Sequence, residues 1–197
     1  MFIQKPAPDF SADALLPNGT FQKVSISDFK DKKYVLLFFY PFNFTFVCPS
    51  EILSFSNKME EFKKRNVSVL GVSVDSKHSH RAWTNAPVGK GGLGKVNFPL
   101  VSDITKSISK KYDVLVDDSF AVRATILIDK SGIVRHYSLN DLPLGRNVDE
   151  FLRIVDALQH NEKYGEVCPA GWKKGKPAMK ETLDSVNSYL KDNINNL

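Results

Sequence analysis

Cysteine is scarce in this sequence, which holds only Cys48 and Cys168 among its 197 residues. So few cysteines exclude the disulfide scaffold of a small secreted protein, and neither of them belongs to a Cys-x-x-Cys pair. The 4 histidines stand at no zinc-ligand spacing around either cysteine, so we expect neither a metal nor another cofactor. Long apolar runs are lacking too, since none approaches the roughly 20 residues that a membrane-spanning helix needs.

A strong imbalance of charge is also missing, because 27 Lys and Arg against 22 Asp and Glu leave a net charge of +5. The basic residues stand in small groups in unrelated segments, as on solvated faces: Lys32-Lys33, Lys63-Lys64-Arg65, Lys110-Lys111 and Lys173-Lys174. We therefore expect neither nucleic acid nor a membrane as a partner. The start of the chain does not show the pattern of a signal peptide, in which basic residues precede an apolar stretch. We therefore expect an intracellular protein. Its compartment is either the cytoplasm or, if a presequence lies outside this sequence, the mitochondrial matrix.

The order of apolar segments predicts an α/β fold, because strand and helix patterns alternate along the chain. Residues 34–40 (YVLLFFY) form a continuous apolar run, which is typical of a central strand covered on both faces. Residues 67–74 predict a second buried strand. Between the two strands, apolar residues at helical spacing predict one amphipathic helix: Ile52, Phe55, Met59 and Phe62.

Weaker signals extend this alternation toward both ends of the chain. A turn at residues 17–19 predicts two short extended segments within residues 10–29. A turn at residues 129–132 predicts a hairpin whose strands are residues 120–128 and 133–139. Helical patterns cover residues 78–85, 104–112, 147–160 and 179–194. Gly and Pro interrupt a polar chain after residue 160, so we predict a domain over residues 1–160 and a C-terminal arm over residues 161–197.

Cys48 lies where the first buried strand gives way to a helix. A cysteine in the first turn of a helix meets free backbone N–H groups and the positive end of the helix dipole, and both favour the thiolate. Pro49 suits that turn, Thr45 can place its hydroxyl beside the sulfur as a donor, and Pro41 can shield the pocket from water. A buried structural cysteine is the alternative for an isolated Cys.

Arg123 interrupts the apolar strand that residues 120–128 predict. A guanidinium without a partner is costly on a buried strand, so Arg123 should face an anion such as a thiolate. A salt bridge at the end of a strand is the alternative.

Six short segments add a more specific pattern through their order: Lys5-Pro6-Ala7-Pro8-Asp9-Phe10, Pro41-x-x-x-Thr45-x-x-Cys48, Phe46-Val47-Cys48-Pro49, Gly91-Gly92-Leu93-Gly94, Asp141-Leu142-Pro143-Leu144-Gly145-Arg146 and Gly165-Glu166-Val167-Cys168-Pro169-Ala170-Gly171-Trp172. With an arginine on a later strand, this set resembles the typical two-cysteine peroxiredoxins over nearly the whole chain.

The resemblance implies a thioredoxin-like fold, with a central mixed β-sheet flanked by helices, and an antioxidant peroxidase that reduces hydrogen peroxide and organic hydroperoxides. It implies that Cys48 is oxidised to a sulfenic acid and that Cys168 of the partner subunit then closes a disulfide, which thioredoxin or a similar dithiol reopens. Thr45 and Arg123 are implied to bind and polarise the peroxide. The family forms homodimers, often assembled into decamers as pentamers of dimers.

Three residues have less specific alternatives beside the roles that the resemblance implies. Glu51 and Arg146 are expected to hold Arg123 in place, although Glu51 also suits any first helical turn and Arg146 any surface loop. Cys168 lies among Gly and Pro, which suits a mobile resolving thiol, and the alternative is an incidental surface cysteine.

Two other functions compete with peroxide reduction, and the first lacks a residue that it needs. A general disulfide oxidoreductase on the same fold would need Cys-x-x-Cys, but residue 51 is glutamate. A chaperone-like holdase or a redox-relay protein is compatible with the same fold, and only the relay would need Cys48. The tail departs from the members that excess peroxide easily inactivates, since those pair a Gly-Gly-Leu-Gly loop with Tyr-Phe and this chain has Tyr189-Leu190.

Overall fold

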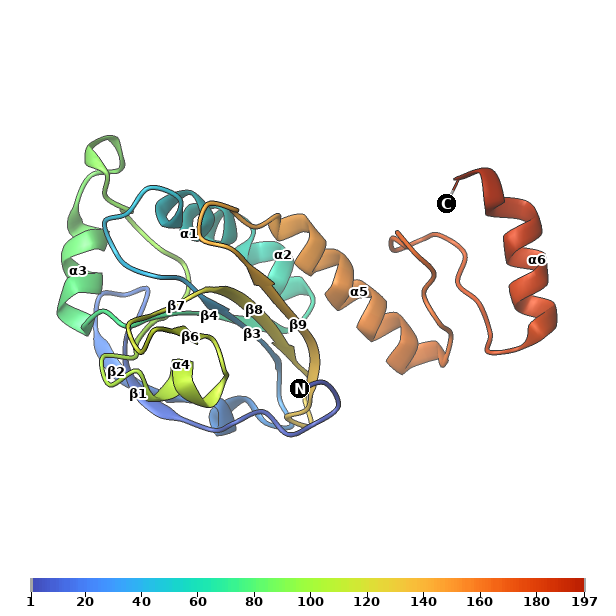
Figure 1. Cartoon of the computed structure of the whole chain (residues 1–197), viewed down its shortest axis with the longest axis horizontal. Helices are drawn as coiled ribbons and strands as arrows, with labels where there is room; N and C mark the ends of the chain where they lie inside the picture. The colour runs from blue at the N-terminus through green and yellow to red at the C-terminus, as the bar shows by residue number, and fades with distance from the viewer. Residues whose placement is uncertain (1, 197) are drawn as a thin grey trace. The chain divides into compact units, whose positions relative to one another are not determined.

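The structure is a computed structural model that describes residues 2–196 (Figure 1). The chain forms two compact units, of which the first ends at Val148 and the second begins at Asp149. In the part of the chain that the structure describes, no helix combines the length and the apolar character needed to cross a membrane.

The first unit is built around a seven-stranded sheet with the order β2-β1-β5-β4-β3-β8-β9. β3 runs parallel to β4 and antiparallel to β8, so the sheet is mixed, as the resemblance implies. Its strands are β1 (Ser11–Leu15), β2 (Phe21–Ser25), β3 (Tyr34–Phe39), β4 (Val67–Ser73), β5 (Leu100–Ser102), β8 (Arg123–Ile128) and β9 (Val134–Asn140). A separate two-stranded sheet consists of β6 (Leu115–Val116) and β7 (Phe120–Ala121).

β3 is buried along its whole length because its alternate side chains enter two different cores. On one face, the ring of Phe38 stacks on Phe55 with 4.3 Å between centroids. On the other face, the ring of Phe39 lies 5.7 Å from that of Tyr112. The prediction of a central strand covered on both faces is therefore confirmed.

The helices of the first unit overlap the predicted helical segments, and two of them are shorter than predicted. They are α1 (Cys48–Asn57), α2 (Met59–Lys64), α3 (Lys77–Asn85), α4 (Ser107–Lys111) and the 3-10 turns η1 (Ile26–Phe29) and η2 (Val88–Lys90). The prediction of one helix through Phe62 was wrong, because Lys58, at φ −96° and ψ 6°, ends α1 and precedes α2. The apolar face still continues across the break, since Met59 and Phe62 are buried.

One strand prediction needs correction, and one strand was not predicted. The predicted strand over residues 120–128 begins only at Arg123, because Phe120 and Ala121 pair with β6 instead of β9. β5, which was not predicted, is three residues long and joins the sheet between β1 and β4.

The second unit holds α5 (Val148–Tyr164) from its second residue onward, α6 (Leu183–Asn193) and η3 (Ile194–Asn196). Between α5 and α6 the chain folds back on itself, because Val167 and Met179 exchange two main-chain hydrogen bonds of 2.7 and 3.0 Å. Trp172 anchors this segment, with its indole N–H donating to the carbonyl oxygen of Lys176 and its own carbonyl accepting from Arg153. The polar segment that carries Cys168 thus has a defined local structure.

Candidate active site

Cys48 is the first residue of α1 and lies fully buried one loop after β3. Val47, the residue before the helix, supplies no side-chain cap, and Pro49 fills the first turn. The positive end of a ten-residue helix therefore lies at the sulfur, without a competing capping side chain. The predicted junction of strand and helix is confirmed.

Arg123, the first residue of β8, lies beside this sulfur. Its Nη1 is 3.3 Å from the Sγ of Cys48 and 2.7 Å from Oε2 of Glu51, and its side chain is 4% exposed. Nε of Arg123 donates to the main-chain carbonyl of Leu142 at 2.6 Å. The guanidinium is therefore held from two sides while one nitrogen faces the sulfur, as predicted for a buried arginine that needs an anion.

Glu51 lies one helical turn after Cys48 and binds two arginines. Its carboxylate accepts from Arg123 and, at 2.8 and 3.0 Å, from Nε and Nη2 of Arg146, whose main-chain N–H adds a bond of 3.0 Å. Arg146 also donates to the carbonyl oxygens of Phe39 and Ala124. Burial lowers the pKa of Arg146, and its hydrogen bonds to Glu51 oppose that shift. The structure thus brings Glu51 and Arg146 together behind Arg123, as expected.

The charges of Glu51, Arg123 and Arg146 do not cancel one another. Two guanidinium groups stand against one carboxylate, and all three side chains are at most 4% exposed. One positive charge therefore remains in a site with little water to screen it. A negatively charged sulfur on Cys48 would balance it, so the site is complementary to a thiolate.

Thr45 differs from the prediction. Its hydroxyl donates to the carbonyl oxygen of Phe42 at 3.0 Å, and no hydrogen bond joins it to Cys48 within residues 2–196. The hydroxyl proton is therefore already used, whereas the oxygen's lone pairs are available to accept. Pro41, two residues after the end of β3, is buried.

Cys168 lies in the second unit, half-buried, and its Sγ is 3.6 Å from the carbonyl oxygen of Ala157 on α5. Burial raises the pKa of the Cys168 thiol; the positive charge of Arg153 lowers it and the carboxylate of Glu166 raises it further. Both cysteines are free thiols in this structure.

Leu142 is a functional contact that sequence reasoning did not find. It binds Arg123 through a main-chain carbonyl, which no side-chain pattern reveals, although the segment around it is among the quoted motifs. A buried polar cluster around His80, behind the loop that carries Thr45, was missed as well.

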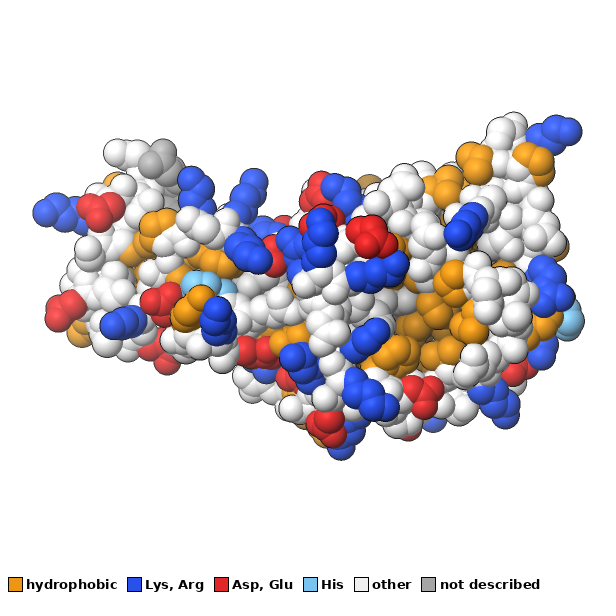
Figure 2. All heavy atoms as spheres, turned by 180° about the vertical axis from the view of Figure 1, so that it is seen from behind, with side chains coloured by type: hydrophobic (Ala, Val, Ile, Leu, Met, Phe, Trp, Pro, Cys, Tyr) orange, Lys and Arg blue, Asp and Glu red, His pale blue; other side chains and the backbone are white. Residues whose placement is uncertain are grey.

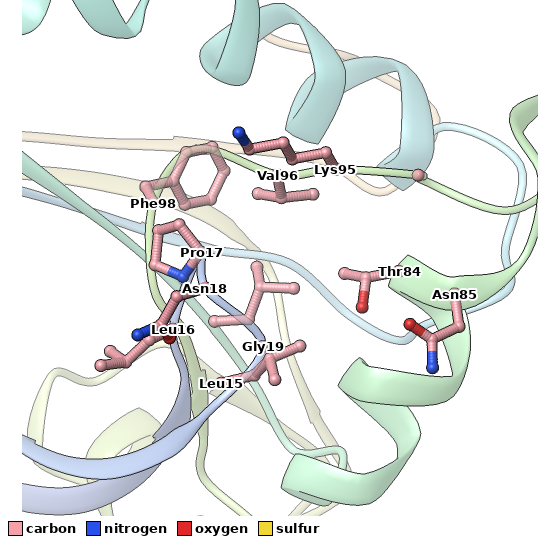
Figure 3. Close-up of a pocket in the computed structure, with 12 residues that line it drawn as sticks. Leu15, Leu16, Pro17, Asn18, Gly19, Thr84, Asn85, Lys95, Val96 and Phe98 are labelled. Atoms are coloured by element: carbon pink, nitrogen blue, oxygen red, sulfur yellow. The ribbon is translucent and has the colours of Figure 1, made fainter.

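A cavity of about 310 Å³ lies elsewhere in the first unit (Figure 3). It is lined by Leu15 to Gly19, by Thr84 and Asn85 at the end of α3, and by Gly94 to Val96 with Phe98 and Leu100. None of the residues expected to be catalytic lines it. This cavity is therefore distinct from the group of residues around Cys48.

On the face that Figure 2 shows, lysine and arginine side chains are spread out and lie among acidic and uncharged ones. The basic side chains on this face therefore have acidic ones among them.

Comparison with known proteins gives matches over nearly the whole chain. The model of the AhpC/TSA family matches residues 3–137, and that of the C-terminal domain of 1-Cys peroxiredoxin matches residues 157–192. Alkyl hydroperoxide reductase C of Helicobacter pylori is 53% identical over 194 residues, which are 98% of each chain. The reduced 2-Cys peroxiredoxin of Plasmodium vivax has a TM-score of 0.96 at 53% identity, over 97% of this chain and 99% of its own. A mitochondrial 2-Cys peroxiredoxin of Plasmodium falciparum has a TM-score of 0.82 at 52% identity, over 85% and 99%.

Proposed function

This chain belongs to the AhpC/TSA family and is a peroxiredoxin, a thiol-dependent peroxidase of antioxidant defence, and on that premise we propose that Cys48 attacks the peroxide and Cys168 resolves the product. The observation that carries the first role is the contact of 3.3 Å between Sγ of Cys48 and Nη1 of Arg123. The substrates of this peroxidase are hydroperoxides, and its reductant is a dithiol of the thioredoxin type.

The reaction takes three balanced steps. The thiolate of Cys48 attacks the peroxide oxygen that carries a hydrogen, and the O–O bond breaks. The other oxygen leaves with the electron pair of that bond and takes up the proton that the Cys48 thiol had released, as water or alcohol. The sulfenic acid on Cys48 then reacts with the thiol of Cys168, forming the disulfide and releasing water. A dithiol donor reduces this disulfide by thiol–disulfide exchange and is itself oxidised.

Stabilisation of the transition state contributes more to the rate than ionisation of the sulfur. A free thiol is a few per cent thiolate at neutral pH, so complete ionisation gains at most roughly 30-fold. Arg123 and the N–H of Cys48 can donate to the two peroxide oxygens as charge develops on them. The Thr45 hydroxyl oxygen can accept a hydrogen bond from the peroxide O–H, because its own hydrogen is donated to the carbonyl oxygen of Phe42.

The C-terminal arm, residues 161–197 after a peroxidase domain of residues 1–160, would bring Cys168 to Cys48 of a partner subunit. The enzyme is then an obligatory homodimer, and pentamers of such dimers would form decamers. For its compartment we propose the cytoplasm or the mitochondrial matrix; a positive net charge of +5 and the similarity to a mitochondrial enzyme fit the second.

Peroxide consumption tests the proposed function directly. We expect hydrogen peroxide to disappear catalytically when the protein is supplied with thioredoxin, thioredoxin reductase and NADPH, and NADPH to be oxidised in equal amount. A protein that consumes no peroxide with any dithiol donor would contradict the proposal.

Non-reducing electrophoresis after peroxide treatment should show a covalent dimer that disappears on adding a thiol reductant. The reason is that the Cys48–Cys168 disulfide joins two subunits in the proposed arrangement. A monomer with an internal Cys48–Cys168 link, identified by peptide mapping, would refute the intersubunit disulfide and leave the peroxidase chemistry intact.

Thr45→Val should lower the second-order rate constant for hydrogen peroxide by roughly 10²-fold, because the site loses one polar group that acts on the transition state. The ultraviolet absorbance of the thiolate gives the ionised fraction of Cys48 in the same variant. If a smaller thiolate fraction accounts for the whole loss of rate, stabilisation of the transition state is not the larger effect.

Leu190→Phe should make Cys48 easier to overoxidise to the sulfinic acid. In the structure the Gly91–Gly94 loop is fixed to α3, with the indole of Trp83 donating to Gly91 at 2.8 Å. The ring of Phe at position 190 adds an aromatic contact that Leu lacks. If the C-terminal tail covers the Gly91–Gly94 loop, this contact stabilises the covered state by about 1 kcal/mol. Mass spectrometry of Cys48 during turnover at rising peroxide measures the effect, and equal sensitivity of variant and wild type would exclude the tail packing.

A further inference from the structure

A buried polar cluster lies behind the loop that joins β3 to α1, and the proposed peroxidase chemistry uses none of its residues. Its members come from the end of β3, the loop, the segment before α3 and α3 itself: Tyr40, Asn43, Asp75, Ser79 and His80. Tyr40 and His80 are fully buried, and Asn43 is 7% exposed. A buried polar network in which every member is bonded fixes one arrangement of the segments that carry it.

The ring of His80 has a defined tautomer. Its Nε2 lies 3.2 Å from the carbonyl oxygen of Val101 on β5, and because that oxygen can only accept, Nε2 carries the hydrogen. Nδ1 is then an acceptor, and it faces the side-chain amide nitrogen of Asn43 at 3.0 Å. Burial lowers the pKa of His80 to about 4, although the charge of Asp75 opposes the shift, so the ring is neutral near pH 7.

The titratable groups around this ring agree with a neutral histidine. Burial raises the pKa of Tyr40 well above its usual range, so its phenol keeps a proton, which it donates to Oδ1 of Asn43 at 3.0 Å. Asp75 is already bonded, because it accepts from the main-chain N–H of Asn43 at 2.9 Å. β1 also packs against α3, and its Asp13 is paired with Lys77 at 2.7 Å.

Every polar group of the Asn43 side chain is therefore used. Its amide nitrogen donates to Ser79 at 2.9 Å and to His80, while its oxygen accepts from Tyr40. The next residue, Phe44, has a φ of +55°, a left-handed conformation that an aromatic residue rarely adopts without support. Thr45 follows directly, so the bonds of Asn43 fix the chain two residues before the Thr45 hydroxyl.

We propose that His80 is a positioning residue for peroxide reduction: it accepts a hydrogen bond from Asn43 and thereby holds the turn that carries Thr45. His80 touches neither the sulfur nor the peroxide, and it acts through Asn43. The inference rests on the proposed function for its effect on rate, but the contact itself can be tested without activity.

Two substitutions at position 80 separate the two ring nitrogens. In His80→Asn, the side-chain amide reaches the place of Nδ1 and can still accept from Asn43; in His80→Gln, the longer side chain reaches the place of Nε2 and keeps the bond to Val101 instead. The measurement is the rate constant for oxidation of Cys48 by hydrogen peroxide in single turnover, with circular dichroism as the control for folding. We expect His80→Asn to stay within threefold of wild type and His80→Gln to be at least tenfold slower.

Asn43→Ala, alone and combined with His80→Gln, tests whether His80 acts through Asn43. The double variant should be no slower than the slower single variant, because both substitutions remove the same contact. The proposal would be overturned if the rate losses of the two single variants multiplied in the double variant. Equal rates for His80→Asn and His80→Gln would overturn it too. If the wild-type protein does not react with peroxide, the proposed peroxidase roles are refuted. The hydrogen bond between Asn43 and His80 is then tested by a measurement that needs no activity.

Asn43→Asp gives that measurement without activity. A carboxylate in place of the amide favours a protonated ring, so the pKa of His80, measured by nuclear magnetic resonance, should rise from about 4 in the wild type to above about 6 in the variant. Asn97→Asp, in which the replaced amide contacts Ser56 and not His80, is the matched control and should leave the His80 titration unchanged. The same titration in Asn43→Asp and wild type would overturn the contact.

Discussion

Cys48→Ser protein should consume no peroxide above the buffer background, because a serine hydroxyl at neutral pH is not a nucleophile for the O–O bond. The ion pair of Arg123 with Glu51 is kept in this variant, and circular dichroism serves as the control for folding. Peroxide consumption with thioredoxin, its reductase and NADPH measures turnover, and titration with a limiting amount of peroxide measures the first step alone.

Cys168→Ser is the matched control for this prediction, since it removes the other thiol and leaves Cys48 in place. This variant should reduce one equivalent of peroxide per subunit and then stop when thioredoxin is the only reductant. Sustained turnover by Cys168→Ser under those conditions would contradict the resolving role. Residual turnover by Cys48→Ser would mean that another residue attacks the peroxide.

Glu51→Gln should damage both stability and rate. The carboxylate binds Arg123 and Arg146 in a site where all three side chains are at most 4% exposed. Glutamine would leave two buried guanidinium groups without their carboxylate, and breaking a buried pair by removing one partner costs roughly 3–5 kcal/mol. Arg123 would also lose the bond that aims it at the sulfur, so we expect the rate constant for peroxide to fall about 10²-fold.

Glu60→Gln makes the same chemical change on the neighbouring helix α2 and is the control. Glu60 pairs with Lys63 at 2.7 Å, but the two side chains are 76% and 59% exposed, and such a pair is worth only about 0.3–0.5 kcal/mol. Thermal unfolding and single-turnover kinetics should therefore separate the two variants clearly. If Glu51→Gln unfolds and reacts like Glu60→Gln, the buried cluster is not what orients Arg123.

The sequence predicted those parts of the fold that depend on strong local patterns. The apolar run of residues 34–40 is β3, and the hairpin of β8 and β9 follows from its turn. β5 was missed because three residues carry no pattern of their own, and it becomes a strand only through pairing with β1 and β4. The break at Lys58 was missed because the apolar spacing continues across it.

The site was predictable where a residue's chemistry demands a partner. Arg123 on an apolar strand had to face an anion, and the structure places Cys48 and Glu51 there. The hydroxyl of Thr45 was assigned the wrong partner, since its direction depends on the turn at Phe42 to Phe44. The network of Asn43 and His80 joins residues from separate elements, which no local pattern reveals.

The single positive charge left over by Glu51, Arg123 and Arg146 links the oxidation state of Cys48 to the local stability of α1. A thiolate on Cys48 neutralises this positive charge, whereas a sulfenic acid that keeps its proton does not. The first oxidation of Cys48 therefore leaves an uncompensated positive charge beneath the first turn of α1. The turn should then open more readily, at the moment when the buried sulfur must reach a second thiol. A sulfinic acid is ionised at neutral pH and restores the balance, so overoxidation would close the site again around a sulfur that can no longer be resolved.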